Sequence, residues 1–475
     1  MNRFALCSTS IVTPDGVKAG AVIIDGERIS AVVHSDHDDY TALGDRMPVT
    51  DYGSLAILPG IVDSHVHVNE PGRTEWEGWA TATRASLAGG ITTIVDMPLN
   101  SSPVTTSVEA LAAKREAAAS SSVEHEINRE FWAGLVPGMT AETITALAAA
   151  GVRGFKCFMC DSGIDEFPAM SVDDLAEAMR AIAATGLPLL AHAEIVPGDG
   201  SAPAWDGSDR SHAAWAATRP ASFEHEAVRE LVELAIVTGC RVHVVHVSSA
   251  QSIELLRDGM RSAAEHAAVA VPVDVAEDES SGPRRGYATF NSDLITYETC
   301  PHYLLLAAEG VPDGATQFKC APPLRSAAEI ETLWQHVLRD VPAIVSDHSP
   351  APSELKELES GSFAAAWGGV SSLGLQLPLI ATALHERGLE RDPLLLFLAT
   401  ALCQRPAELA GLTPERGAII PGAAADLAIF DLDDEWTISG ADAGWRWRLT
   451  PYEGRPVRGR VQATYVNGAA RFVRA

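Results

Sequence analysis

The chain has 475 residues, of which 47% are hydrophobic and 21% are charged, a composition typical of a globular protein with a sizeable core. Its 63 acidic and 35 basic residues give a formal net charge of −28, which argues against nucleic acid or an anionic membrane as a partner because both would repel it. The N-terminal residues contain no basic segment followed by an apolar run, so we expect a cytoplasmic protein with no membrane span.

Short alternating apolar runs separated by turn residues occur at both ends of the chain. We expect residues 1–56 to form the N-terminal part of a small β-sandwich domain. Residues 401–475 should supply a final helix and the rest of that domain. The two ends of the chain are therefore expected to meet in space.

Between these ends, residues 57–400 alternate β-type apolar runs with amphipathic, alanine-rich segments. This α/β pattern is typical of a parallel sheet covered by helices, and eight strand candidates predict a (β/α)8 TIM barrel. The predicted strands are 58–68, 91–97, 131–136, 152–158, 187–193, 241–247, 294–299 and 343–348. The predicted helices include 74–89, 140–150, 171–185, 223–238, 250–265, 326–339 and 372–386.

A long polar segment separates the sixth and seventh predicted strands. Residues 266–292 contain most of the acidic stretch VPVDVAEDESSGPRRGYATFNSD, which has no clear periodicity. We expect an exposed insertion, and both a surface loop and a lid over a substrate remain open.

The first predicted barrel strand ends in the sequence DSHVHV. Residues two apart on a strand share a face, so Asp63, His65 and His67 should all point into the barrel. Active sites of such barrels lie at the C-terminal ends of the strands. A single histidine there could be a hydrogen-bonded core residue, but a pair on one face favours a metal site.

Other predicted strands also end in ionisable residues: Lys156 on the fourth, His192 on the fifth, His246 on the sixth and Asp347 on the eighth. A lysine in such a place needs a lowered pKa, an ion pair, or conversion by carbon dioxide into a carbamate. The two carbamate oxygens could bridge two divalent ions.

Four nearby side chains are not expected to bind metal. His243 is three residues before His246, and His348 is one residue after Asp347. An odd spacing places two residues on opposite faces of a strand, so we expect both histidines to point away from the site. Cys157 and Cys160 form a CxxC motif without a second pair, which favours packing over zinc binding or redox chemistry, and we expect all seven cysteines to be reduced.

These strand ends, together with the phrases LPGIVDSHVH, PGAAADLAIFD and YETCPHYLLL, resemble the metal-dependent amidohydrolase superfamily, and in particular its cyclic amidohydrolases. The resemblance implies two divalent metal ions, zinc being the expected metal with cobalt, manganese or iron left open. It also implies a homotetramer, and Asp347 as the catalytic base that takes a proton from water and returns it to the leaving amide nitrogen. The implied ligands are His65, His67 and Asp347 for one ion, His192 and His246 for the other, and N6-carboxylated Lys156 as the bridge.

Within that group, the phrases EPGRTEWEG, DMPLNSSP and FKCFMCDSGIDEFP resemble the allantoinases. The implied reaction is hydrolysis of the cyclic amide bond of allantoin, a small-molecule cyclic ureide, to give allantoate. The candidate substrate contacts are Asn100, Ser162, Cys320 and Gly369. Asn100 could equally stabilise a turn.

Other activities remain open. Dihydroorotases typically carry an arginine two residues after the second histidine, where this chain has Asn69, although Arg73 is close in sequence. A hydantoinase or dihydropyrimidinase acting on a related ring is a nearer alternative. A non-catalytic relative that has lost its metal ligands is a third, against which the six filled ligand positions argue.

Overall fold

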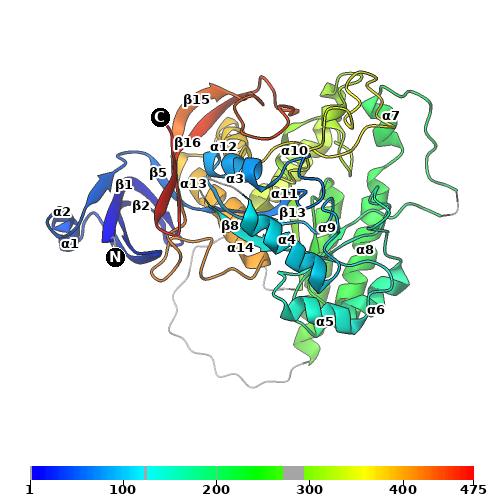
Figure 1. Ribbon diagram of the computed structural model, residues 1–475, viewed down its shortest axis with the longest axis horizontal. Coiled ribbons are helices and arrows are strands. Elements are labelled where there is room, and N and C mark those ends of the chain that lie inside the picture. Colours follow the sequence, from blue (N-terminus) through cyan, green and yellow to red (C-terminus); the bar gives the residue numbers. More distant parts are fainter. Residues whose placement is uncertain (1–2, 122–125, 199, 271–293) are drawn as a thin grey trace.

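The computed structural model describes residues 3–121, 126–198, 200–270 and 294–475 of the chain. It contains a parallel α/β barrel and a second sheet built from both chain ends (Figure 1). The predicted fold class is therefore confirmed. Of the predicted insertion at 266–292, the first residues continue helix α9 (Ala250–Ala270), and the remainder lies outside the described residues.

In the part of the chain that the structure describes, eight parallel strand positions form the barrel. Hydrogen bonds join β6, β7 and β8 in one run and β9 to β14 in another. β8 and β9 share one position and are separated only by Trp132, while a bridge between Val66 and His348 links the last position to the first. The strands are β6 (Ile61–Val66), β7 (Ile91–Asp96), β8 (Asn128–Phe131), β9 (Ala133–Gly134), β10 (Phe155–Phe158), β11 (Leu189–His192), β12 (Val242–Val244), β13 (Ile295–Thr299) and β14 (Ala343–Ile344).

The prediction of one strand over residues 58–68 is wrong, because two strands meet there. β5 (Ala56–Pro59) pairs with strands of the chain-end sheet, and the barrel begins only with β6. Gly60 separates them, and a Cβ atom at Gly60 would lie 2.3 Å from the side chain of Thr92. Only glycine allows the chain to pass from one sheet to the other this close to β7. The apolar sequence hides the break because both strands are buried.

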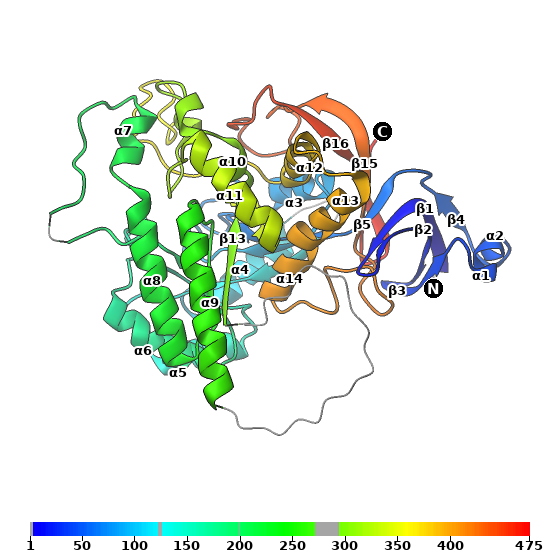
Figure 2. The ribbon, with the colours of Figure 1, turned by 180° about the vertical axis from the view of Figure 1, so that it is seen from behind.

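Helices surround the barrel on its outer side (Figures 1 and 2). α6 illustrates how: Ser171 caps its first turn by accepting the N–H of Asp174, and Leu175, Met179 and Ile182 form its buried face. The helices are α3 (Trp79–Ala88), α4 (Val108–Ser120), α5 (Ala141–Ala149), α6 (Val172–Ala183), α7 (His212–Ala217), α8 (Ala221–Thr238), α9, α10 (Pro301–Leu305), α11 (Ala327–Asp340), α12 (Gln376–Glu386), α13 (Arg391–Ala399) and α14 (Arg405–Leu409).

Two predicted helices begin later than expected. α3 starts at Trp79 rather than at residue 74, because the carboxylate of Glu70 accepts the N–H of Trp79 at 2.8 Å and so caps the first turn from a distance. α12 starts at Gln376 rather than at residue 372. The amides of Ser372 and Leu373 instead donate to the ring of His348. Helix α4 was not predicted, since its alanine-rich sequence has little amphipathic pattern.

Strands from both chain ends form a single sheet in the order β17-β16-β15-β5-β1-β2-β3, with β4 added beside β1. The sheet curls, because the rings of Phe4 on β1 and Tyr465 on β16 lie 6.3 Å apart although two strands separate β1 from β16. None of the described helices is long and apolar enough to cross a membrane. The remaining elements are β1 (Arg3–Thr13), β2 (Gly16–Asp25), β3 (Arg28–His34), α1 (Asp38–Thr41), α2 (Leu43–Arg46), β4 (Val49–Asp51), β15 (Leu427–Thr437), β16 (Pro456–Val466) and β17 (Ala469–Val473).

Candidate metal centre

Four histidines gather at the C-terminal ends of barrel strands. The ring centroid of His65 lies 5.6 Å from that of His67 and 5.4 Å from that of His246. The His246 ring is in turn 4.6 Å from that of His192. All four side chains are buried. The structure therefore brings the four predicted histidines together from three different strand positions.

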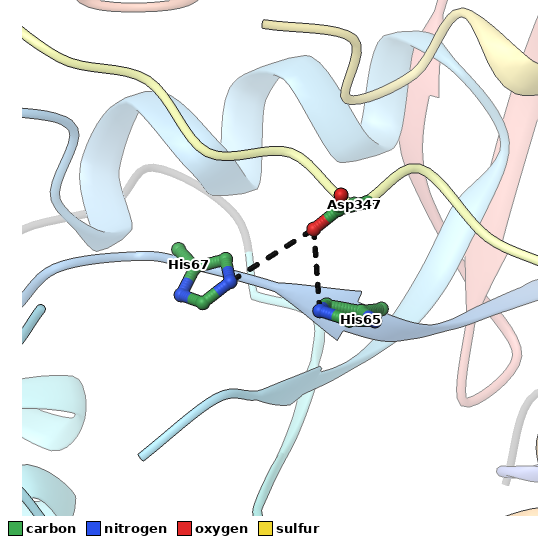
Figure 3. Close-up of side chains that lie close together, drawn as sticks. All are labelled: His65, His67 and Asp347. Atoms are coloured by element: carbon green, nitrogen blue, oxygen red, sulfur yellow. Dashed lines mark ion pairs between the residues drawn. The ribbon is translucent and has the colours of Figure 1, made fainter. Parts of the chain in front are cut away.

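Asp347 and Lys156 complete this cluster. One carboxylate oxygen of Asp347 lies 3.2 Å from Nε2 of His65 and 3.9 Å from Nε2 of His67 (Figure 3). Burial lowers the pKa of Lys156 to about 8 against an opposing effect of Glu298, and burial raises the pKa of Asp347 to about 6. All six predicted side chains line one cavity of about 420 Å³.

The cluster contains buried nitrogen atoms that lack a hydrogen-bond partner. Within the described residues, no donor or acceptor pairs with Nδ1 of His67, Nδ1 of His246 or Nζ of Lys156. Buried polar atoms are normally paired, because losing water without a replacement is costly. Burial also lowers the pKa of His192 to about 4, and it lowers the pKa values of His67 and His246 well below the usual range of histidine, which keeps these imidazoles neutral. Neutral imidazoles beside a carboxylate are a donor set that fits divalent transition metals.

Two of the six residues have unusual backbone conformations. His246 has a φ of 41° and Asp347 a φ of 46°, in the left-handed region that side chains other than glycine rarely adopt. Such conformations persist only where the surrounding structure imposes them, and they are common at functional sites. Here each turns a side chain at a strand end into the shared cavity.

A second layer of carboxylates orients the histidines. Glu298 on β13 lies 2.5 Å from Nδ1 of His65 and 3.1 Å from Nε2 of His243. Glu194 lies 2.7 Å from Nε2 of His192 and also accepts from Arg219 at 2.6 Å. Burial alone would raise the pKa of each glutamate, but the histidines, with Arg219 beside Glu194, lower both to about 2. Glu298 accepts a ring N–H from His65 and Glu194 accepts one from His192, which leaves the lone pair on the other ring nitrogen of each histidine available to a metal.

Sequence reasoning missed both glutamates. Glu194 follows His192 by two residues, and Glu298 lies near the end of a predicted strand, so both carried a usable same-face signal. It also missed His302, which is fully buried, has both ring nitrogens unpaired among the described residues, and lies 3.9 Å from Asp347.

Replacing Glu298 with glutamine should weaken metal binding without removing any predicted ligand. The amide cannot hold the His65 tautomer as the carboxylate does, so we expect metal affinity to fall by about 10- to 100-fold. Competition with a chromophoric chelator measures the change. Glu435→Gln, on an exposed side chain of β15, is the matched control. An affinity equal to that of the unmodified protein would contradict this role.

Other candidates in the predicted site have structural partners. His348 accepts the amides of Ser372 and Leu373, and His243 contacts Thr296 and Glu298, so both point away from the cavity as expected. Asp63 accepts from the amide of Ser346 and from Gln376, and therefore joins β6 to the end of β14 rather than lining the cavity.

The four candidate substrate contacts differ in position. Asn100, Ser162 and Gly369 line the cavity, whereas Cys320 does not, although both of its neighbours do. Cys320 is buried and its carbonyl oxygen accepts from the indole N–H of Trp215. The hydroxyl of Ser162 donates to the carbonyl of Phe167 at 2.6 Å, so it is used within its own loop.

The geometry around Asn69 argues against a dihydroorotase-type site, in which an arginine would bind a carboxylate of the substrate. Arg73, the arginine close in sequence, donates to the carbonyl of Asn100 at 2.9 Å and stacks on Trp76 at 5.2 Å. Neither Asn69 nor Arg73 lines the cavity. Asn100 has a left-handed backbone conformation, with a φ of 61°, which agrees with the alternative that its side chain stabilises a turn.

Comparison with known proteins agrees with this geometry. A model of the amidohydrolase family matches residues 56–303, and a model described as the composite domain of allantoinase matches residues 1–54. An allantoinase of Streptomyces avermitilis is 40% identical over 468 residues, covering 98% of this chain and 94% of that protein. This chain belongs to the amidohydrolase family, in its allantoinase branch.

Allantoinases from distant organisms are similar along most of the chain. The allantoinase of Arabidopsis thaliana is 36% identical, covering 98% of this chain and 87% of that protein. The allantoinase of Saccharomyces cerevisiae is 39% identical, with 88% and 83% covered. The predicted family is confirmed, and membership of the amidohydrolase family implies a binuclear metal centre.

Solved structures with this fold include hydantoinases. An L-hydantoinase of Arthrobacter aurescens aligns with a TM-score of 0.82 at 25% identity, covering all of this chain and 98% of the other. A D-hydantoinase aligns with a TM-score of 0.78 at 22% identity, covering 98% and 95%. The fold is thus shared with enzymes named for other rings, and the ring specificity must come from the cavity itself.

Proposed function

We propose that this amidohydrolase opens the ring of allantoin by hydrolysing its cyclic amide bond, which gives allantoate. The observation that carries the proposal is the convergence of six ionisable side chains in one cavity of a chain 40% identical to an allantoinase. A cavity of about 420 Å³ suits a small cyclic ureide.

We assign the metal ligands as the sequence suggested. His65, His67 and Asp347 would hold one divalent ion, His192 and His246 the other, and Lys156 would bridge them as its N6-carbamate. Zinc is the proposed metal, since imidazole and carboxylate donors suit it. When bound, two such ions would polarise the ring carbonyl and lower the pKa of a water molecule.

Lys156 is suited to carboxylation by its surroundings. A neutral amine is needed to attack carbon dioxide, and burial lowers the pKa of this lysine to about 8. The reaction forms a C–N bond and releases one proton, leaving a carbamate anion. Its buried Nζ has no hydrogen-bond partner in the described part of the chain, so carboxylation would break no hydrogen bond there.

The chain's own residues orient and transfer protons. Glu298 and Glu194 hold the tautomers of His65 and His192 through hydrogen bonds of 2.5 and 2.7 Å. Asp347, which lies 3.2 Å from His65 and lines the cavity, is the proposed base that accepts a proton from water. Its carboxylic acid then returns that proton to the leaving amide nitrogen.

A panel of four rings tests the proposal: allantoin, hydantoin, dihydrouracil and dihydroorotate. The protein is reconstituted with zinc, cobalt, manganese or iron in bicarbonate buffer, and kcat/KM is measured for each ring. We expect allantoin to exceed each other ring by at least about tenfold. Faster opening of dihydrouracil would favour a dihydropyrimidinase, the activity nearest to the hydantoinases that share the fold. A protein that binds well under one ion per chain and opens no ring would be a scaffold.

A further inference from the structure

Lysine is rare in this chain and is mostly buried. The sequence contains lysine at only five positions, and its other basic residues are arginines. Lys18 is exposed, whereas the other four are no more than 6% exposed. Lysine is among the residues least often buried, so each of these four needs a local reason. The buried lysines are Lys114, Lys156, Lys319 and Lys356.

For two of these four lysines the reason for burial is clear. Lys156 belongs to the candidate metal centre, and Lys114 pairs with Asp96 at 2.8 Å. Lys319 and Lys356 form no ion pair with any described carboxylate. Their partners are backbone carbonyls of one segment, residues 364–369, which we name the pocket wall because all six of its residues line the candidate active-site cavity.

Lys319 holds the first half of the pocket wall. Its ammonium group donates to the carbonyl oxygens of Ala366 at 2.6 Å and Ala364 at 3.3 Å. The same ammonium lies 4.4 Å from the ring centroid of Trp215, another residue of the cavity. Cation–π contact and two carbonyls therefore replace most of the water that the charge has lost.

Lys356 holds the second half. It donates to the carbonyl oxygen of Trp367 at 3.1 Å and to that of Gly369. Burial lowers the pKa of Lys319 to about 8 and that of Lys356 to about 7. Charged or neutral, an amine keeps at least two N–H groups, so the contacts to two carbonyls survive in either state.

The pocket wall is also fixed relative to the end of the eighth barrel strand. The amide of Gly369 donates to the carbonyl of Lys319 at 2.9 Å, and the amide of Ser349 donates to that of Val370 at 2.9 Å. Gly369 has a φ of 116°, and a Cβ atom there would lie 2.3 Å from the carbonyl oxygen of Ser349. Ser349 follows Asp347 by two residues, so a shift of the wall changes the side of the cavity next to the proposed base.

We propose that Lys319 and Lys356 are positioning residues that fix the pocket wall against the bound ring substrate. Their amines donate to four wall carbonyls, so the substrate meets a surface whose backbone acceptors already have partners and whose shape is fixed. Neither lysine belongs to the six-residue cluster. Their loss should therefore weaken substrate binding while leaving the metal content and the chemical step nearly intact. This assignment rests on the proposed function only in taking the 420 Å³ cavity as the active site.

Lys319→Met and Lys356→Met test the assignment in the full-length, metal-loaded protein. Methionine keeps an unbranched apolar chain but leaves two wall carbonyls without their donor. We expect KM for the ring that the wild type opens fastest to rise by at least about tenfold, equivalent to about 1.4 kcal/mol. We expect kcat to stay within about threefold and the metal content to be unchanged. Amide hydrogen exchange should increase in peptides covering residues 364–369.

Three further variants separate positioning from general stability. Lys18→Met, at the exposed lysine, should change nothing, and Leu256→Ala, in the core of α9, should lower the melting temperature without changing KM. Lys356→Gln keeps N–H donors and should give an intermediate KM. It also provides a test at this position if Lys356→Met fails to fold. An unchanged KM in the lysine variants, or changes that only follow the melting temperature, would overturn the assignment. If the wild type opens no ring, the proposed function fails, and hydrogen exchange still decides whether the lysines hold the wall.

Discussion

Replacing Lys156 with arginine is expected to abolish ring hydrolysis. Arginine keeps a positive charge at this buried position but cannot form a carbamate, so the proposed bridge between the two ions is lost. Losing several kcal/mol of transition-state stabilisation corresponds to a fall in kcat/KM of at least about a thousandfold. Elemental analysis should find no more than one tightly bound ion per chain.

The same site offers a positive control. In Lys156→Ala, the space left by the side chain can admit a small carboxylate such as acetate or propionate, and we expect such ions to restore part of the activity with a saturable dependence on their concentration. Mass spectrometry of the unmodified protein under non-denaturing conditions should detect the added carbon dioxide. Substantial activity in Lys156→Arg would rule out the carbamate and leave the lysine as an unmodified cation.

Asp347→Asn is expected to reduce kcat by about 100- to 10,000-fold, the range typical of losing a general acid–base group. The amide retains an oxygen that can contact an ion but cannot take a proton from water. Asp161→Asn is the matched control, because Asp161 lines the same cavity, is exposed, and among the described residues accepts a hydrogen bond only from the amide of Gly163.

Asp347→Asn and Lys156→Arg should differ in their effect on ion binding. Asp347→Asn should retain most of its metal, since four histidines and Lys156 are untouched. A kcat in Asp347→Asn within a few-fold of the wild type would assign the proton transfer elsewhere. His302, 3.9 Å from Asp347 and fully buried, would then be the next candidate.

The buried environment explains why these residues can work together. Burial lowers the pKa values of His67, His192 and His246, so these imidazoles present lone pairs rather than protons near neutral pH. The carboxylates that would compete for metal from the second layer, Glu194 and Glu298, are engaged by ring N–H groups instead. The neutral imidazoles can therefore bind cations, while the ionised glutamates orient the imidazoles.

The amino-acid sequence by itself determined the strand ends of the candidate site. An apolar run that ends in an ionisable residue identifies both the strand and its C-terminal end, and the two-residue repeat assigns the face. His65 and His67 could be paired by this rule, and Lys156, His192 and Asp347 followed from the regularity of the barrel. The face and the end of each strand are local inferences, because each needs only one strand and its boundary.

Only the tertiary structure decided which groups from distant parts of the chain contact each of these residues. The break at Gly60 depends on the approach of Thr92, and the role of Glu298 depends on two histidines from other strands. The partners of Lys319 and Lys356 are likewise set by the fold, because both amines donate to carbonyls of the pocket wall. The physical reason is that a buried polar group is defined by the partner that replaces its lost water, and here that partner comes from a remote part of the chain.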